Sequence, residues 1–172
     1  GAPVINTVAY GGVSMTKLTQ KESASGFEIS LWYLIWPASW ANNVVITASA
    51  GSVVWMSSSF TWVGASFPDA SGTAWPTTTT SYSQSITTVA DNCWAVWVGI
   101  AENGSALTNG ANTVKRQYDT AQIGLFIADT NSAKTPAWTD TMTFTSWNQS
   151  FASIMASFAP PSAVNSNFLM FM

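Results

Sequence analysis

Hydrophobic residues occupy both faces of one strand-like segment, residues 27–36, with the sequence FEISLWYLIW. Read with the two-residue period of a strand, one side is apolar throughout, while the other changes from polar at Glu28 to apolar at Trp36. A strand with two apolar faces needs a covering layer on each of them. We therefore expect this segment in the middle of a sheet, with one face packed on a second sheet and the other partly covered by a loop or by another subunit.

Residues 93–100 form a second, almost wholly apolar segment, which we expect to lie beside or opposite residues 27–36. Residues 139–147 alternate cleanly, with Met142 and Phe144 set against threonines. Residues 61–76 are rich in Gly, Pro, Ser and Asp and are predicted to be a loop.

About nine or ten short apolar or alternating segments are separated by turn residues, and none has a sustained helical period. The sequence therefore predicts an all-β fold, an antiparallel two-sheet β-sandwich that is jelly-roll-like. Residues 1–160 are expected to form this domain and residues 161–172 a C-terminal tail. The expected core includes Leu31, Tyr33, Val96, Val98, Ile123, Leu125, Phe144 and Ile154.

Composition separates this chain from most intracellular domains. Only 8% of the 172 residues are charged, against about 25% in typical proteins, and Ser, Thr and Asn fill the polar positions. Such a hydroxyl-rich surface is typical of secreted and virion proteins. The net charge of −3, with five basic residues, argues against a nucleic-acid partner. Since no uncharged apolar run reaches about 18 residues, no membrane span is expected.

The residues that most often carry chemistry are scarce. Histidine is absent, which excludes Ser-His-Asp and Cys-His catalysis and removes the commonest metal ligand. Cys93 is the single cysteine, so it cannot form an intrachain disulfide, and its apolar neighbours indicate a buried side chain. Neither a phosphate loop nor a dinucleotide fingerprint is present. We expect no enzymatic activity and no cofactor.

Acidic residues allow two readings. Asp129 and Asn131 offer oxygen ligands at a spacing that suits calcium, but the pair is also typical of a turn in which the aspartate accepts a backbone hydrogen bond. The turn is the favoured interpretation, here and for the other aspartates. Glu28 is expected to be an outward-facing or loop-covered residue of its strand rather than a catalytic one.

Tryptophan is unusually frequent, with ten residues. Those in expected strands are interpreted as core or interface residues. Those in expected loops are candidates for a platform on which sugar rings stack, although packing of the loops against the sandwich explains them as well. These ligand-binding candidates are Trp40, Trp62, Trp75 and Trp138.

Four short motifs resemble a module of bacterial surface proteins and phage virion proteins. They are YGGVSMT at residues 10–16, LWYL at 31–34, NNVVIT at 42–47 and ASFAP at 156–160. The module has the approximate pattern TYNGVxMT, LWYL, NVVVT and ASFAP and is largely uncharacterised. The resemblance implies a β-sandwich and gives no catalytic residues. Members usually have a further strand or two before the first motif, whereas this sequence begins only a few residues ahead of it. We therefore expect that the sandwich is incomplete in one chain.

The tail ends in five large apolar residues: Phe168, Leu169, Met170, Phe171 and Met172. Left in water they would be an aggregation hazard, so we expect them to be covered. They either fold back as an edge strand of their own sandwich or add a strand to a neighbouring copy, and the second placement is favoured.

The sequence therefore predicts a non-enzymatic structural protein that forms a homo-oligomer or polymer. It would be a self-assembling subunit of a virion (capsid, decoration or tail), or of an extracellular filament or surface layer. The expected location is extracellular, on a virion or at a cell surface. The alternative is a carbohydrate-binding or adhesin module that binds a glycan through its loop tryptophans.

Overall fold

The computed structural model describes residues 4–22, 26–49, 57–59, 67–74, 78–120, 123–160 and 168–171. These residues form strands and turns and contain no helix. The strands are β1 (Ile5–Tyr10), β2 (Val13–Ser14), β3 (Thr16–Glu22), β4 (Glu28–Ile35), β5 (Val44–Ala48), β6 (Ser57–Ser59), β7 (Phe67–Ala74), β8 (Thr79–Thr87), β9 (Trp94–Ala101), β10 (Thr108–Asn109), β11 (Val114–Asp119), β12 (Gly124–Asp129), β13 (Thr139–Gln149), β14 (Phe151–Ala159) and β15 (Phe168–Phe171).

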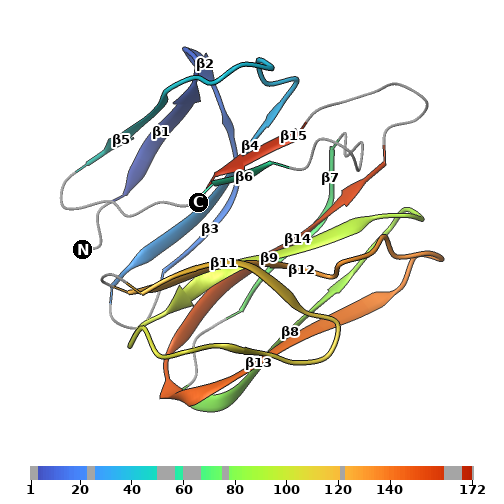
Figure 1. Cartoon of the computed structure of the whole chain (residues 1–172). Coiled ribbons are helices and arrows are strands. Elements are labelled where there is room, and N and C mark those ends of the chain that lie inside the picture. The colour runs from blue at the N-terminus through green and yellow to red at the C-terminus, as the bar shows by residue number, and fades with distance from the viewer. Residues whose placement is uncertain are drawn as a thin grey trace.

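The strands pair antiparallel in four sheets. Sheet I has the order β2-β1-β5, sheet II β3-β4-β15-β6, sheet III β11-β12-β9-β14-β7 and sheet IV β10-β13-β8. Figure 1 shows them as successive layers, from sheet I at the top to β8 and β13 of sheet IV at the bottom. The predicted all-β antiparallel sandwich is confirmed, with four sheets where the sequence pattern indicated two.

Sheet III is an inner layer of the stack, and both of its faces are covered. All eight residues of β9 are buried. Val96 and Val98 pack with Leu31 of sheet II, whereas Trp97 on the opposite face packs with Phe144 of sheet IV. The segment 93–100 is thus the facing partner of residues 27–36, one of the two arrangements expected.

Strand β4 contacts a different layer on each face. Leu31 is fully buried in the core shared with sheet III, and Trp32, on the other face, packs with Val8 of sheet I and with Met15, which lies between β2 and β3. The second apolar face of this strand is therefore covered by a sheet of the same chain.

Most of the expected core residues are buried. Leu31, Val96, Val98, Leu125, Phe144 and Ile154 are at most 5% exposed. Tyr33 and Ile123 are partly buried at the margin of the same cluster. Cys93 is also buried, as predicted. The strand phases read from the sequence are therefore correct for these strands.

Aromatic rings fill the space between sheets III and IV. Trp97 stacks on Tyr82 and Phe144, and Tyr82 stacks on Phe151 with ring centroids 4.5 Å apart. The polar atoms of this core are paired, because Gln84 Oε1 accepts a hydrogen bond from Trp97 Nε1 at 2.9 Å.

Residues 67–74 correct the prediction of a loop at 61–76. They form β7, which pairs with β14 at the edge of sheet III. Pro68, Asp69 and Gly72 disfavour strands in general, but an edge strand tolerates proline because one side of its backbone needs no partner. A register shift between Ser157 and Phe158, the partner of Pro68, lies at this point.

Candidate functional site

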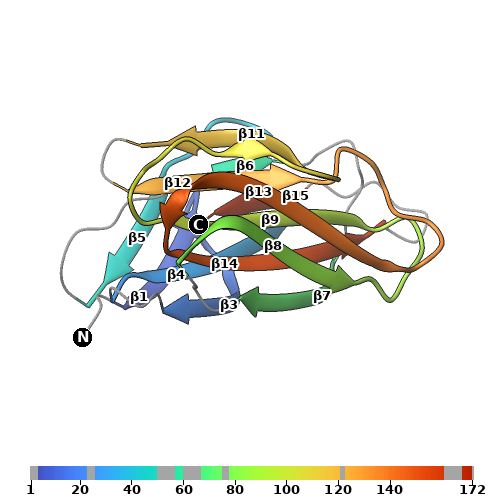
Figure 2. The ribbon, with the colours of Figure 1, turned by 90° about the horizontal axis from the view of Figure 1, so that it is seen from below.

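Between residues 81 and 87 of β8 and residues 139 and 145 of β13, the outward side of the strand pair carries only hydroxyl residues. Thr145 lies opposite Ser81, and the same pairing of Ser or Thr continues along both strands. Figure 2, seen from below, shows these two strands in front of β9 and β14. We call this side the hydroxyl face, and its residues are Ser81, Ser83, Ser85, Thr87, Thr139, Thr141, Thr143 and Thr145.

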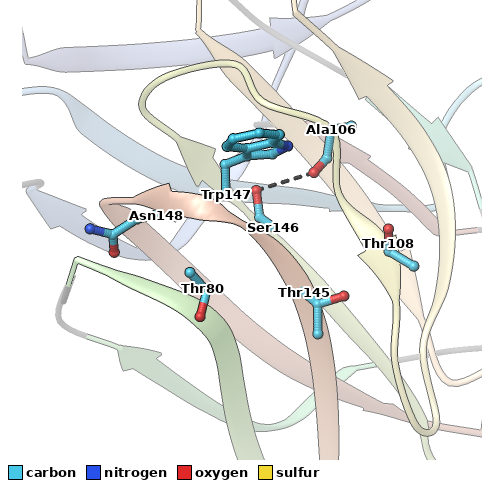
Figure 3. Close-up of a pocket in the computed structure, with 7 residues that line it drawn as sticks. All are labelled: Thr80, Ala106, Thr108, Thr145, Ser146, Trp147 and Asn148. Atoms are coloured by element: carbon cyan, nitrogen blue, oxygen red, sulfur yellow. Dashed lines mark hydrogen bonds between the residues drawn. The ribbon is translucent and has the colours of Figure 1, made fainter.

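A shallow hollow of about 520 Å³ lies at one end of the hydroxyl face. Figure 3 shows its walls, which come from β8, from β13 and from the segment around β10. Seven residues line it: Thr80, Ala106, Thr108, Thr145, Ser146, Trp147 and Asn148.

Trp147 is placed by an irregularity of β13. The register between β13 and β8 shifts between Thr145 and Gln149, as a bulge does, and bulges re-aim side chains. Gln149 is buried and donates to Ser146 Oγ, which in turn donates to the carbonyl oxygen of Ala106 at 3.1 Å. These hydrogen bonds anchor the bulge, and the indole of Trp147 beside it is 80% exposed.

The chemistry of the hollow is neutral. Its described lining residues offer hydroxyl groups and one amide, which both donate and accept hydrogen bonds, and none of these described residues is titratable. An exposed indole offers an apolar ring face at the same place. Hydroxyls around a ring face suit a neutral ligand with many hydroxyl groups and apolar C–H faces, which describes a sugar.

A second, smaller hollow of about 230 Å³ contains Trp138, one of the predicted residues. Trp138 is 72% exposed and shares the hollow with Lys134 and Asp140, whose charged groups lie 3.4 Å apart. This hollow combines an indole with an ion pair, so its chemistry differs from that of the Trp147 hollow.

The other predicted tryptophans lie elsewhere. Trp40 is 70% exposed in the connection between β4 and β5, and its carbonyl oxygen accepts a hydrogen bond from Tyr10 of sheet I. Trp40 and Trp138 are thus associated with the two outermost sheets of the stack, and they form no common platform. Trp62 and Trp75 lie outside the described residues.

Trp147 was missed as a candidate because it ends the alternating segment at residues 139–147 and was interpreted only as part of that strand. One signal in the sequence was available. Trp147 has the odd-numbered parity of the outward threonines, not the even-numbered parity of Met142 and Phe144.

Asp129 has a partner that the sequence did not suggest. Arg116 donates to both of its carboxylate oxygens, at 2.6 and 2.9 Å, and also donates to Asn131. The hydrogen bonds that Arg116 donates to the Asp129 carboxylate raise the pKa of the arginine. Asn131 N also donates to Asp129 at 2.7 Å, as in the predicted turn. The oxygens considered for calcium are thus occupied by a guanidinium, and the described residues contain no cluster of three or more metal-ligating acids, histidines or cysteines.

The partly exposed Asp69 and the buried Cys93 lie together beside the turn at residues 89–92. Burial raises the pKa of the Cys93 thiol to about 12, with a contribution from the nearby Asp69 carboxylate. Burial also raises the pKa of Asp69, but hydrogen bonds from the Val89 and Ala90 amides and from Ser157 outweigh it and lower the value. The thiol is therefore held in its unreactive form.

The predicted interface segment forms β15, apart from Met172, which lies outside the described residues. It pairs with β4, where Leu169 lies opposite Leu34, and with β6, where Leu169 lies opposite Ser59. In the single chain the segment therefore takes the intrachain placement, and it lies between two strands rather than at an edge.

Comparison of the chain with family models, curated proteins and solved structures finds no match in any of the three. The described residues also contain no helix of the length and hydropathy that a membrane span needs.

Proposed function

We propose that this protein is a non-enzymatic, extracellular carbohydrate-binding module that holds a neutral sugar in the Trp147 hollow. The observation that carries this proposal is the lining of the hollow, where an exposed indole occurs together with hydroxyl and amide groups and none of the described lining residues is charged. Ligand sites in proteins combine an apolar or aromatic surface with a few convergent polar groups in this way.

The geometry favours this site over Trp40 and Trp138, the predicted tryptophans that lie within the described residues. The backbone that carries Trp147 is anchored, since Ser146 is hydrogen-bonded to Ala106 and Gln149. A backbone that is fixed before a ligand binds loses little conformational freedom on binding, which improves affinity.

The test is retention of the protein by neutral polysaccharides in affinity electrophoresis, with β-1,4-glucan, chitin and galactan as probes and alginate as an anionic control. Trp147→Ala should weaken binding by tenfold or more, because truncating a central tryptophan costs about 2 kcal/mol or more. Trp138→Ala is the matched control, since it removes an equally exposed indole beside an ion pair. Retention that is unchanged in Trp147→Ala would refute the proposal.

Self-assembly is the second candidate function, as a structural subunit of a virion, an extracellular filament or a surface layer. It is favoured by the position of β15, which fills a place between β4 and β6 although it follows β14 of another sheet. The same place on a neighbouring copy presents the same strand edges, so β15 can be exchanged between copies.

A disulfide distinguishes exchange from fold-back. Leu34 and Leu169 are direct partners across β4 and β15, and the native Cys93 is buried. Oxidation of the double variant Leu34→Cys/Leu169→Cys at high protein concentration should give cross-linked dimers or polymers if strands are exchanged. Deletion of residues 168–172 should then abolish assembly while the rest of the domain stays folded. Cross-linking that is entirely intrachain would refute exchange.

A further inference from the structure

The hydroxyl face continues away from the hollow in rows of cross-strand pairs. The first row is Thr145 with Ser81, and the next is Thr143 with Ser83. Successive rows on one face are about 6.6 to 6.8 Å apart, twice the rise of a strand residue. The face therefore presents hydroxyl groups at regular intervals, beginning at the wall of the hollow, which Thr145 itself forms.

The two halves of this face differ in whether their hydroxyls are already bonded. In the far half, Ser85 shares a hydrogen bond with Thr141, and Thr87 shares one with Thr139, each at 2.7 Å. Each of these pairs has already satisfied part of its hydrogen-bonding capacity.

In the near half, the side-chain hydroxyls of Ser81, Ser83 and Thr145 make no hydrogen bond within the described part of the chain, and all three residues are exposed. Thr143 is less accessible, because Gly110 packs so closely against its side chain that a Cβ added at Gly110 would overlap Thr143 Oγ1. Available hydroxyl groups thus run from the hollow across Thr145 and along β8.

We infer that the hollow and the near half of the hydroxyl face form one elongated site for a linear neutral oligosaccharide. This inference rests on the proposed function and specifies its ligand. One sugar stacks on Trp147, and the sugars that follow bond to Thr145, Ser81 and Ser83. The site ends where Ser85 and Thr141 bond to each other.

Charge and polarity select this occupant over other polymers. The near half has no basic side chain to neutralise phosphates or uronic acids and no large apolar residue to anchor a protein segment. A neutral glycan chain instead exchanges hydrogen bonds with water for hydrogen bonds with these hydroxyls, while its ring faces contact the indole.

The test is calorimetric titration with β-1,4-linked glucose and N-acetylglucosamine oligomers and β-1,4-linked galactose oligomers, from monosaccharide to hexasaccharide. Affinity should rise by tenfold or more with chain length and then level off. Ser81→Ala/Ser83→Ala, at two residues of the near half that do not line the hollow, should remove most of this gain while leaving monosaccharide binding within about twofold, a change of about 0.4 kcal/mol. Thr139→Val, in the far half, is the matched control and should behave as the unaltered protein.

The outcomes separate this inference from the proposed function. Binding that depends on Trp147 but is independent of chain length, or a length gain that survives in Ser81→Ala/Ser83→Ala, would overturn the elongated site alone. Absence of binding to all three sugar series would overturn both.

Discussion

Gln84 offers the most direct test of what holds sheet IV to sheet III. It is 7% exposed, and its Oε1 accepts hydrogen bonds from Trp97 Nε1 at 2.9 Å and from Ser153 Oγ at 2.5 Å. Its Nε2 donates to the carbonyl oxygen of Gly72 at 2.9 Å, which links β8 to β7. Replacement of Gln84 by methionine keeps the length of the side chain and removes all three hydrogen bonds.

The expected loss follows from which partners are left unsatisfied. Three neutral hydrogen bonds contribute about 0.5 to 1.5 kcal/mol each, and a buried donor without a partner costs about 1 to 3 kcal/mol. Ser153 retains Tyr82 as a partner at 2.7 Å, whereas the Trp97 N–H, in a fully buried residue, loses its acceptor. We expect Gln84→Met to lower the free energy of unfolding by about 3 kcal/mol. For a chain of this length, Tm should fall by about 6 to 12 °C.

Urea denaturation of a double-mutant cycle with Trp97→Phe isolates the pairwise contribution. Trp97→Phe removes the donor, so Gln84→Met should cost less in that background, with a coupling of about 1 to 2 kcal/mol. The matched control is Ser85→Ala, which removes a hydroxyl from the exposed face of the same strand. Two changes that add to within about 0.5 kcal/mol would show that the hydrogen bond between Gln84 and Trp97 does not stabilise the interface.

Three further predictions concern the core, the buried thiol of Cys93 and the partly exposed carboxylate of Asp69. Leu31→Ala should cost about 2 to 5 kcal/mol in urea denaturation, because it leaves a cavity between sheets II and III, and a loss below about 1 kcal/mol would contradict the packing. Cys93, with a pKa raised to about 12 by burial, should react with a thiol reagent only as the protein unfolds, so rapid labelling at neutral pH would contradict its burial. The hydrogen bonds from Val89 and Ala90 lower the pKa of Asp69 below its unfolded value, so they stabilise the fold above about pH 4, and this contribution is lost as the pH falls through the folded pKa. Asp69→Asn should therefore flatten the acid side of the stability profile, and an unchanged acid limb would refute the linkage.

The central strands could be predicted from the sequence because burial imposes a pattern on them. Residues 27–36 and 93–100 are apolar on both faces, and each lies between two layers in the structure. Met142 and Phe144 alternate with threonines because one face of β13 meets the core and the other meets water. Where one or both faces of a strand are buried, the local pattern of apolar and polar residues is therefore enough to predict the strand and its buried faces.

Edge strands and long-range hydrogen bonds could not be predicted in this way. β7 contains proline and glycine, and it is a strand because β14 provides a partner, which is a property of distant sequence. Asp69 was interpreted as a turn residue bonded to nearby backbone, but it accepts from Val89 and Ala90, about twenty residues away. The Trp147 hollow was missed for the same reason, since it joins β8, β13 and the segment around β10.

The stacking of four sheets implies that the molecule opens unevenly. Strand β9 has hydrogen-bonded neighbours on both sides and packed layers on both faces. Its backbone amides should therefore exchange with deuterated water only through global unfolding. Sheet I rests on a much smaller cluster around Val8 and Trp32, so its amides should exchange first through local opening. Protection measured strand by strand should therefore decrease from β9 towards β1 and β5, which would make sheet I a separate cooperative unit of an otherwise continuous fold.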